Sequence, residues 1–505
     1  MYRILDYWVS LNRYKTRQLF YRMVYKLSPP KNVSSYKNYT NNSITNMEFK
    51  LSNFLVNNNI PKNKQKHIAD TISLFNQDKI NVLDQEYSLN SFFNNDIFKK
   101  NFPHKLKSYE VSYFQFCHDI AFGILNNQIS HDQILRFFNT VIDILTQSIK
   151  LNNKHPFWYS YSVSTRIINL SFLYITINQK NIIDKSKLDF LRGQLLLSSE
   201  ILENNLEFDS DGNHLLKNYT ALFIIYNLFG DTRKSLKYKK KIKILLSYQI
   251  LPSGLYFEKS FDYHMLVLHD LYYTEIIYRQ SNNYEAESGL VTELINMYSF
   301  AEKFYKEKEK PLFHDCFEPE YFDHNELLEI IKNFLENNHI KILTNNSVAP
   351  YINHSGKNFS LIIDSSEISP SFCPAHSHDH CLHYELWYKG KKIITDSGNY
   401  NYTESKERKY FRSSSAHNIS VPKNIDSQSV LLKSFRFGRT AKRKYIHIEN
   451  NKNITASVNG YYKGFKINSF QRNFSINDKY IVIHDQFFNQ RAINFIHLHP
   501  KVEII

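Results

Sequence analysis

The hydrophobic period changes once along this chain, and that change limits the folds it can adopt. From about residue 47 to about residue 338, apolar residues recur every three or four positions and glycine and proline are sparse, which predicts helices. From about residue 342 onward the period is two, which predicts strands. Helices followed by strands, segregated in sequence, are typical of an all-α domain joined to an antiparallel β domain.

Individual segments support both halves. Residues 213–229, NHLLKNYTALFIIYNLF, carry the wide apolar face of a helix that packs among other helices. Residues 383–398, HYELWYKGKKIITDSG, predict two strands around a Lys-Gly turn, and residues 470–486 predict a hairpin over Asn-Asp. A chain of 505 residues is too long for one ordinary core. We therefore predict a basic, aromatic segment and linker (1–46), a helical domain (47–340) and a β domain (341–505).

Composition narrows the class of protein. A hydrophobic fraction of 42% and a charged fraction of 22% are those of a soluble globular protein. The net charge of +15 would attract polyanions. No helix-turn-helix, zinc-finger or RNA-binding signature occurs, so we do not expect nucleic acid as the partner. Four cysteines are too few for a disulfide framework at this length.

The N-terminus does not read as an export signal. Residues 1–27 carry charges every few positions and lack an uninterrupted apolar stretch, and no later run is long enough to span a bilayer. This basic, aromatic start could lie on a membrane surface as an amphipathic helix, but we favour packing on the main body and do not expect membrane association. By sequence alone the location would be cytoplasmic.

Seven segments carry the residue types of a chemical site. They are HPFWYSYSVSTRIIN (155–169), LEFDSDGNHLLKNYTALF (206–223), QILPSGLYFEKSFDYHMLVLHDL (249–271), KPLFHDCF (310–317), FCPAHSHDHCLHYELW (372–387), TDSGNYNY (395–402) and RKYFRSSSAHNISV (408–421). Their order and spacing resemble the heparinase II/III family of polysaccharide lyases and its alginate-lyase relatives, over nearly the whole chain. The pattern departs from the family at Ser253 and Tyr256, where Asp and His are usual.

The resemblance implies an (α/α) toroid followed by a β-sandwich, and β-elimination across a uronic-acid glycosidic bond in an acidic polysaccharide. Such an enzyme must offset the charge of the sugar carboxylate, remove the proton from C5, and protonate the leaving oxygen at C4. The sequence ends with NFIHLHPKVEII, in what looks like a mid-sandwich strand, so we expect a short or truncated sandwich.

The resemblance assigns catalytic roles to four residues. Asn213 and His214 would neutralise the carboxylate, although both could instead cap the helix that follows. Tyr263 would transfer a proton, and because a free phenol has a pKa near ~10, nearby positive charge would have to activate it as a base. The alternative for Tyr263 is a core tyrosine at helical spacing. His376 would be the opposing acid or base.

The resemblance also implies a structural zinc site and no organic cofactor. By position its ligands are His378, Asp396 and His417, a set that suits zinc. Cys373 and Cys381 flank the histidines, but we do not expect a thiolate ligand.

Other residues of these segments receive lesser roles. His380 and His383 are expected to be surface or sheet residues. Substrate-binding roles, each open to a structural explanation such as an ion pair, fall to Arg166, Glu258, His264 and Arg412.

We therefore predict a lyase that leaves an unsaturated uronic acid at the new chain end. Two alternatives remain open at this stage: a C5-uronyl epimerase, which begins with the same proton abstraction, and a non-catalytic glycan-binding or assembly protein of surface-polysaccharide production. Members of the resembled family are periplasmic, in contrast to the location that this N-terminus suggests.

Overall fold

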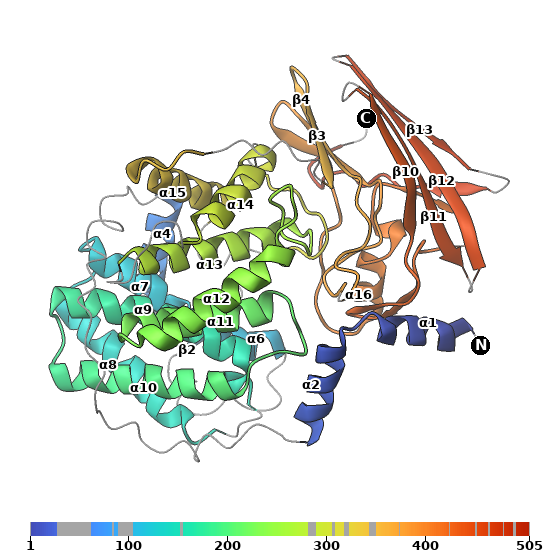
Figure 1. The fold of residues 1–505 in the computed structure, drawn as a ribbon. Helices are drawn as coiled ribbons and strands as arrows, with labels where there is room; N and C mark the ends of the chain where they lie inside the picture. Colours follow the sequence, from blue (N-terminus) through green and yellow to red (C-terminus); the bar gives the residue numbers. More distant parts are fainter. Residues whose placement is uncertain are drawn as a thin grey trace.

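The computed structural model describes most of the chain. It covers residues 2–27, 62–82, 85–88, 105–151, 155–280, 289–305, 309–317, 323–342, 350–372, 374–423, 425–449, 452–462, 465–477, 479–487 and 491–503. Most helices gather in one body and most strands in a second body beside it, as the period change predicts (Figure 1). The expected linker at residues 36–46 lies outside the described residues.

The helices of the helical body follow one another along the chain. Its helices are α4 (Lys62–Asn76), α6 (Lys105–Tyr113), α7 (Phe116–Leu125), α8 (His131–Ser148), α9 (Ser160–Lys180), α10 (Lys185–Asn204), α11 (Asn213–Leu228), α12 (Thr232–Gln249), α13 (Phe261–Arg279), α14 (Val291–Phe304) and α15 (His324–Asn337). Local sequence fixes several of their ends. Ser130 is the N-cap of α8 and Asp323 is the N-cap of α15. Each forms a capping box that satisfies backbone N–H groups at the start of its helix.

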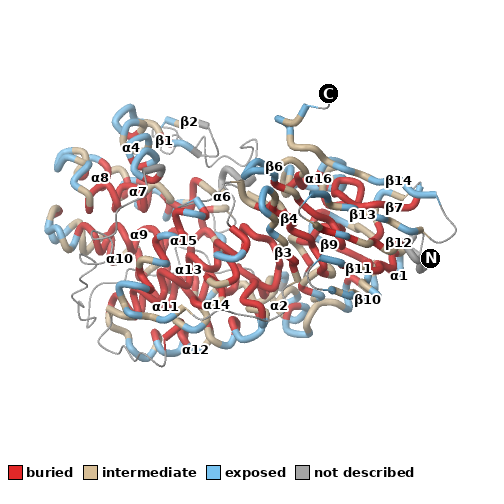
Figure 2. The backbone as a smooth tube through the Cα atoms, turned by 90° about the horizontal axis from the view of Figure 1, so that it is seen from above, coloured by how far each residue is buried: buried red, intermediate tan, exposed pale blue. Residues whose placement is uncertain are grey.

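Helices α9, α11 and α13 form the centre of this body. Nearly every residue of α11 and α13 is buried, and one apolar cluster joins these helices to their neighbours (Figure 2). The sequence pattern of residues 213–229 predicted a single apolar face, but a helix enclosed on most sides buries its other faces too. One element departs from the helical prediction: a hairpin of β1 (Lys79–Val82) and β2 (Gln85–Ser88).

The second body consists mainly of antiparallel strands. One sheet has the order β3-β4-β5-β6 and another the order β10-β11-β12-β13. Their strands are β3 (Tyr351–Ser355), β4 (Phe359–Asp364), β5 (Tyr384–Tyr388), β6 (Lys391–Ile394), β10 (Lys442–Glu449), β11 (Asn453–Tyr462), β12 (Phe465–Ile476) and β13 (Ile481–Gln486). Shorter pieces are β7 (Ser420–Pro422), β8 (Leu431–Lys433), β9 (Arg436–Phe437), β14 (Ala492–Asn494) and the helix α16 (Lys406–Phe411).

Both predicted hairpins are present. Strands β5 and β6 are joined at Lys389 and Gly390, whose positive φ angles of 51° and 73° suit a tight hairpin turn. Strands β12 and β13 pair from Gln471 with Gln486 onward. Side chains of both sheets, including Leu361 and Phe474, share one apolar cluster. The two sheets therefore bury residues against each other.

Two further helices lie at the N-terminus, apart from the helical body (Figure 1). They are α1 (Tyr2–Asn12), beside the second body, and α2 (Thr16–Leu27), and we call residues 2–27 the N-terminal arm. No helix in the described part of the chain is both long and apolar enough to cross a bilayer.

Candidate active site

The start of helix α13 lies where the helical body meets the strands. Ser260 Oγ donates to the backbone oxygen of Asp315 at 2.7 Å, and Tyr351 Oη donates to the backbone oxygen of Lys259 at 2.8 Å. Ser260 is also the N-cap of α13, since its side chain accepts the Tyr263 N–H at 3.2 Å. The first turn of α13 is thus fixed at the junction of the two bodies.

Tyr263 is in contact with His376. Their ring centroids lie 4.0 Å apart, and the Tyr263 hydroxyl lies 3.3 Å from the hydroxyl of Tyr402. Burial, together with Tyr402 and the Asp315 carboxylate, raises the pKa of Tyr263 well above that of a free phenol. Nearby positive charge does not lower the pKa of Tyr263 below that of a free phenol, as a role as base would require. Tyr263 therefore keeps its proton at neutral pH and is suited to act as an acid.

Glu258 links Asn213 to His376. Its carboxylate accepts the backbone N–H of Asn213, and its Oε2, which is buried without a hydrogen-bond partner, lies 4.0 Å from His376 Nε2. A Cβ atom on Gly212 would lie 2.7 Å from Glu258 Oε1, so a larger residue at 212 would require this carboxylate to shift. Burial raises the pKa of Glu258. Glu258 therefore connects the first residue of α11 to His376, which contacts Tyr263.

His214 lies at the edge of this site. Its Nδ1 is 2.9 Å from Glu207 Oε1, and its ring packs against Tyr161 at 4.5 Å. Burial lowers the pKa of His214, but the Glu207 carboxylate outweighs it and the pKa is raised overall. With 39% of its side chain exposed, His214 can donate to an anion in solution.

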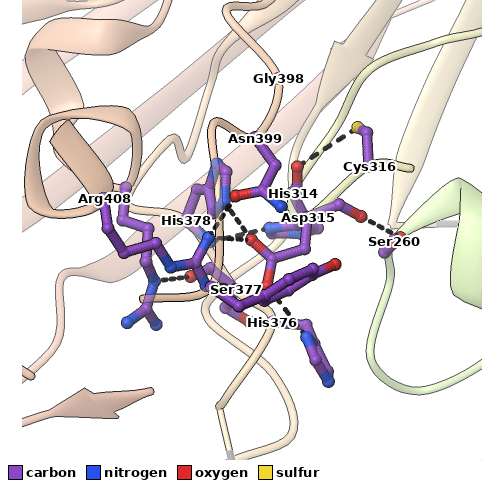
Figure 3. Close-up of polar contacts among 12 residues, drawn as sticks. Ser260, His314, Asp315, Cys316, His376, Ser377, His378, Gly398, Asn399 and Arg408 are labelled. Carbon is purple, nitrogen blue, oxygen red and sulfur yellow. Dashed lines mark hydrogen bonds and ion pairs between the residues drawn. The ribbon is translucent and has the colours of Figure 1, made fainter. Parts of the chain in front are cut away.

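Asp315 connects three cationic or ionisable side chains (Figure 3). Its Oδ2 accepts from His376 Nδ1 at 2.9 Å and its Oδ1 accepts from His378 Nε2 at 2.8 Å. The two terminal nitrogens of Arg408, Nη1 and Nη2, donate to the same carboxylate. The bond to Nδ1 fixes the hydrogen of His376 there and leaves Nε2 as the basic nitrogen facing Glu258.

Sequence reasoning assigned no role to Asp315, Arg408 or Tyr402. All three lie in the quoted motifs, at 310–317, 408–421 and 395–402, so the motif boundaries were the available signal.

Three residues predicted to bind substrate do not reach the site. Arg166 is fully buried among helices, where it donates to the backbone oxygens of Ser112 and Phe157, both at 2.9 Å. His264 is fully buried in α13, where its Nδ1 accepts the Tyr256 N–H and its Nε2 lies 3.1 Å from the Met297 oxygen. Each therefore has a structural role.

Arg412 is the third of these residues. Its guanidinium group donates to the backbone oxygens of Ser377 at 3.0 Å and Pro374 at 3.2 Å, and the side chain is 1% exposed. Burial lowers its pKa to about 9. Arg412 holds the histidine-rich loop in place instead of facing the site.

Four buried side chains gather next to Asp315. One potential ligand atom from each of His380, His383, Asp396 and His417 lies within 4.8 Å of the others. His380 and His383 are 1% and 0% exposed and lie outside the strands, so their expected position at the surface or in a sheet is wrong. His378 does not belong to this group, although its ring centroid is 5.4 Å from that of His417.

The hydrogen-bond partners of each histidine indicate which of its ring nitrogens could bind a metal. His383 Nδ1 accepts the Asn418 N–H at 2.9 Å, which leaves its hydrogen on Nε2, 2.9 Å from Asp396 Oδ2. His380 is arranged the other way round. Its Nε2 is 3.2 Å from Asp364 Oδ2, while its Nδ1 has no hydrogen-bond partner and lies 3.6 Å from Asp396 Oδ2. A carboxylate beside Nε2 leaves Nδ1 of His380 free to bind a metal.

Three further buried nitrogens, His383 Nε2, His417 Nε2 and His378 Nδ1, have no hydrogen-bond partner. The other nitrogen of His417 faces Asp396 at 2.9 Å, and that of His378 faces Asp315 at 2.8 Å. Imidazole nitrogens with one carboxylate are a ligand set that suits zinc. The residues present therefore fit a zinc ion.

Comparison with known proteins identifies the family. The sequence matches the heparinase II/III N-terminus over residues 36–342 and the heparinase II/III-like C-terminal region over residues 345–505. The chain belongs to the heparinase II/III family. No match was found among curated proteins.

Solved structures show the same fold. A crystal structure of heparinase III has a TM-score of 0.59 and 16% identity, covering 90% of this chain and 74% of that one. A mutant heparan sulfate lyase from Pedobacter heparinus has a TM-score of 0.53 and 14% identity, covering 93% of this chain and 73% of that one. At these identities the similarity concerns the fold.

Proposed function

We propose that this protein is a lyase that cleaves a uronic-acid-containing polysaccharide by β-elimination. The observation that carries the proposal is the contact between the protonated Tyr263 and the Asp315-bound His376, with Asn213 and Glu258 in the same site. Family membership supports a polysaccharide substrate. The basic net charge of +15 is complementary to an acidic polymer.

Each side chain then has one task. His376 Nε2 removes the C5 proton, and Asp315 stabilises the resulting imidazolium. Asn213 and His214 donate hydrogen bonds to the carboxylate as negative charge develops on it. The C4–O bond breaks, the C4=C5 double bond forms, and Tyr263 gives its proton to the leaving oxygen.

The test is a panel of uronic-acid polymers monitored for the ultraviolet absorbance of the new double bond. Tyr263→Phe is expected to lower kcat by roughly 10²- to 10⁴-fold with little effect on KM, because it removes only the proton donor. The matched control is Tyr298→Phe, which removes a buried hydroxyl bonded to Glu302 in α14, outside the site. Equal activity of Tyr263→Phe and the unmodified protein would contradict the proposal.

The same panel separates the two alternatives. A C5 epimerase would form no double bond but would exchange the C5 hydrogen with solvent deuterium. A non-catalytic glycan-binding protein would bind the polymer equally well after Tyr263→Phe and form no product.

We also propose that a structural zinc ion is held by His380, Asp396 and His417. This set replaces His378, the ligand expected from sequence, with His380, because a ligand atom of His380 lies within 4.8 Å of those of Asp396 and His417. Zinc bound here would supply a cross-link between the loop before β5, the loop after β6 and the segment before β7. No organic cofactor is included in the proposal.

Metal analysis of the purified protein tests this ligand set. We expect about one zinc ion per chain, and loss of zinc with a lower Tm after strong chelation. His380→Ala should abolish zinc binding, whereas the exposed His447→Ala should leave the metal content unchanged. Full zinc content in His380→Ala but not in His378→Ala would instead restore the set expected from sequence.

The finer architecture is part of the same proposal. The sequential helices of the helical body are consistent with an (α/α) toroid, and the apolar cluster shared by the two four-stranded sheets is consistent with a β-sandwich.

A further inference from the structure

Helix α1 has its polar side toward the protein and its apolar side toward solvent. Ile4, Trp8 and Leu11 form one stripe and are 74%, 60% and 47% exposed. Asp6 and Ser10 are only 3% and 4% exposed. A helix that merely packs on the protein body would bury the opposite set.

Helix α2 shows the same inversion. Leu19, Phe20 and Met23 are 41%, 54% and 54% exposed, whereas Gln18 is fully buried. The Gln18 side chain donates to the backbone oxygens of Asp209 and Ser210, both at 3.3 Å. The expectation that the N-terminal segment packs on the main body is therefore met, but largely through polar residues.

Specific contacts hold the N-terminal arm in this orientation. Asp6 accepts from Arg439 Nε at 2.8 Å, and Arg13 Nη2 donates to the Gly438 oxygen at 2.7 Å. A Cβ atom on Gly438 would lie 2.6 Å from Asp6 Cβ, so α1 lies directly against this backbone. Lys15 pairs with Asp211 at 2.9 Å. The outward direction of the apolar stripes is thus fixed by contacts with both bodies.

The N-terminal arm is also basic. The arm contains six basic residues and one acidic residue. Arg17 is 45% exposed, although it also contacts Asp211 at 3.4 Å, and Lys26 is exposed. Arg17 is near enough to Lys241 of the basic helix α12 to lower the pKa of that lysine, after burial and Lys237. The surface next to α2 is therefore basic as well.

We propose that the N-terminal arm binds the surface of a bilayer that contains anionic lipids. Short helices with an apolar face that includes Trp and Phe, flanked by Lys and Arg, insert that face at the boundary of headgroups and acyl chains. Each cation near an anionic surface strengthens binding roughly fivefold. A second copy of the chain fits the arm less well, because it would bring two sets of like charges together.

Binding would have a consequence for the candidate site. The arm contacts residues 209–211, which directly precede Gly212 and Asn213. A membrane-bound arm would therefore hold this side of the site close to the bilayer.

Sedimentation of the full chain with lipid vesicles tests the proposal. We expect binding to vesicles of phosphatidylcholine with phosphatidylglycerol, weaker binding at high salt, and little binding to phosphatidylcholine alone. Trp8 fluorescence should shift to the blue on binding, since Trp158 and Trp387 are already buried at 6% and 0% exposure.

The decisive variant replaces Ile4, Trp8 and Phe20 by Ser and should weaken vesicle binding about tenfold or more. Its matched control replaces three exposed residues of the strand body by Ser. These are Tyr480, Val482 and Ile496, which are 60%, 48% and 51% exposed. Unchanged circular dichroism and Tm in both variants establish that each is folded.

Three results would overturn the proposal. The first is absence of binding to the anionic vesicles at low salt, and the second is binding that the triple arm variant retains. The third is concentration-dependent self-association that the arm variant abolishes without any vesicle binding, which would assign the apolar stripes to a second copy of the chain.

Discussion

Asp315 illustrates how one side chain can organise a site. Burial alone would raise its pKa, but Arg408, His376 and His378 hold the pKa well below its usual range. Its two oxygens bind histidines that are two positions apart in the sequence, one in the candidate active site and one beside the candidate metal site. The position of His376 is therefore tied to that of His378.

Asp315→Asn is expected to lower kcat by roughly 10²- to 10⁴-fold, because an amide no longer stabilises a protonated His376. It should also destabilise the protein by about 3–5 kcal/mol, since Arg408 stays buried without its carboxylate. Activity assays and chemical denaturation measure the two effects.

The control for Asp315 is Asp270→Asn, which breaks the buried pair with Lys217 at 2.6 Å in the helical body. It should cost similar stability and leave kcat unchanged. Equal kcat losses in both variants would show that Asp315 acts through stability alone.

At the scale of elements, helix α13 connects the fold to the site. Its N-cap Ser260 binds both the Tyr263 N–H and the backbone oxygen of Asp315, so one hydroxyl positions the residues on either side of the site. Because Ser260 is the N-cap, Tyr263 lies in the first turn of α13.

Ser260→Ala is expected to destabilise the protein by about 1 kcal/mol through the lost cap. It should also lower kcat, because Tyr263 and Asp315 lose their common anchor. Ser130→Ala removes a comparable cap from α8, far from the site in sequence, and should lower stability without affecting kcat. A normal kcat in Ser260→Ala would contradict the anchoring role.

At the scale of the whole molecule, several histidines are buried in the neutral form. Burial lowers the pKa of His264 to about 3, and burial also lowers the pKa values of His118 and His324. The unfolded chain returns these groups to about 6.5. Because the folded pKa is the lower one, their contribution to stability is fully present above pH 6.5 and is lost as the pH falls toward the folded value.

The free energy of unfolding should therefore fall on acidification from pH 7 to pH 5, by about 2 kcal/mol for each such histidine. Urea denaturation at several pH values measures this slope. His264→Gln should reduce the slope, whereas the exposed His447→Gln should not. Stability that is independent of pH across this interval would contradict the assignment of neutral buried histidines.

Much of the architecture was predictable because periodicity is a local property of the chain. The order of helices and strands and the hairpins at residues 383–398 and 470–486 follow from neighbouring residues. The motifs also named residues that the fold brings together, including Asn213, Tyr263 and His376.

Other features depend on which distant segments meet. Arg166 is a core residue because α6 and the 3₁₀ turn at Pro156–Trp158 supply its hydrogen-bond acceptors. His380 belongs to the group of possible metal ligands, and Asp364 at the end of β4 lies 3.2 Å from its Nε2. The sequence by itself determined the local elements and the residues available for chemistry. Only the tertiary structure decided which polar groups are paired, buried or exposed, because those properties are set by contacts between residues far apart in the chain.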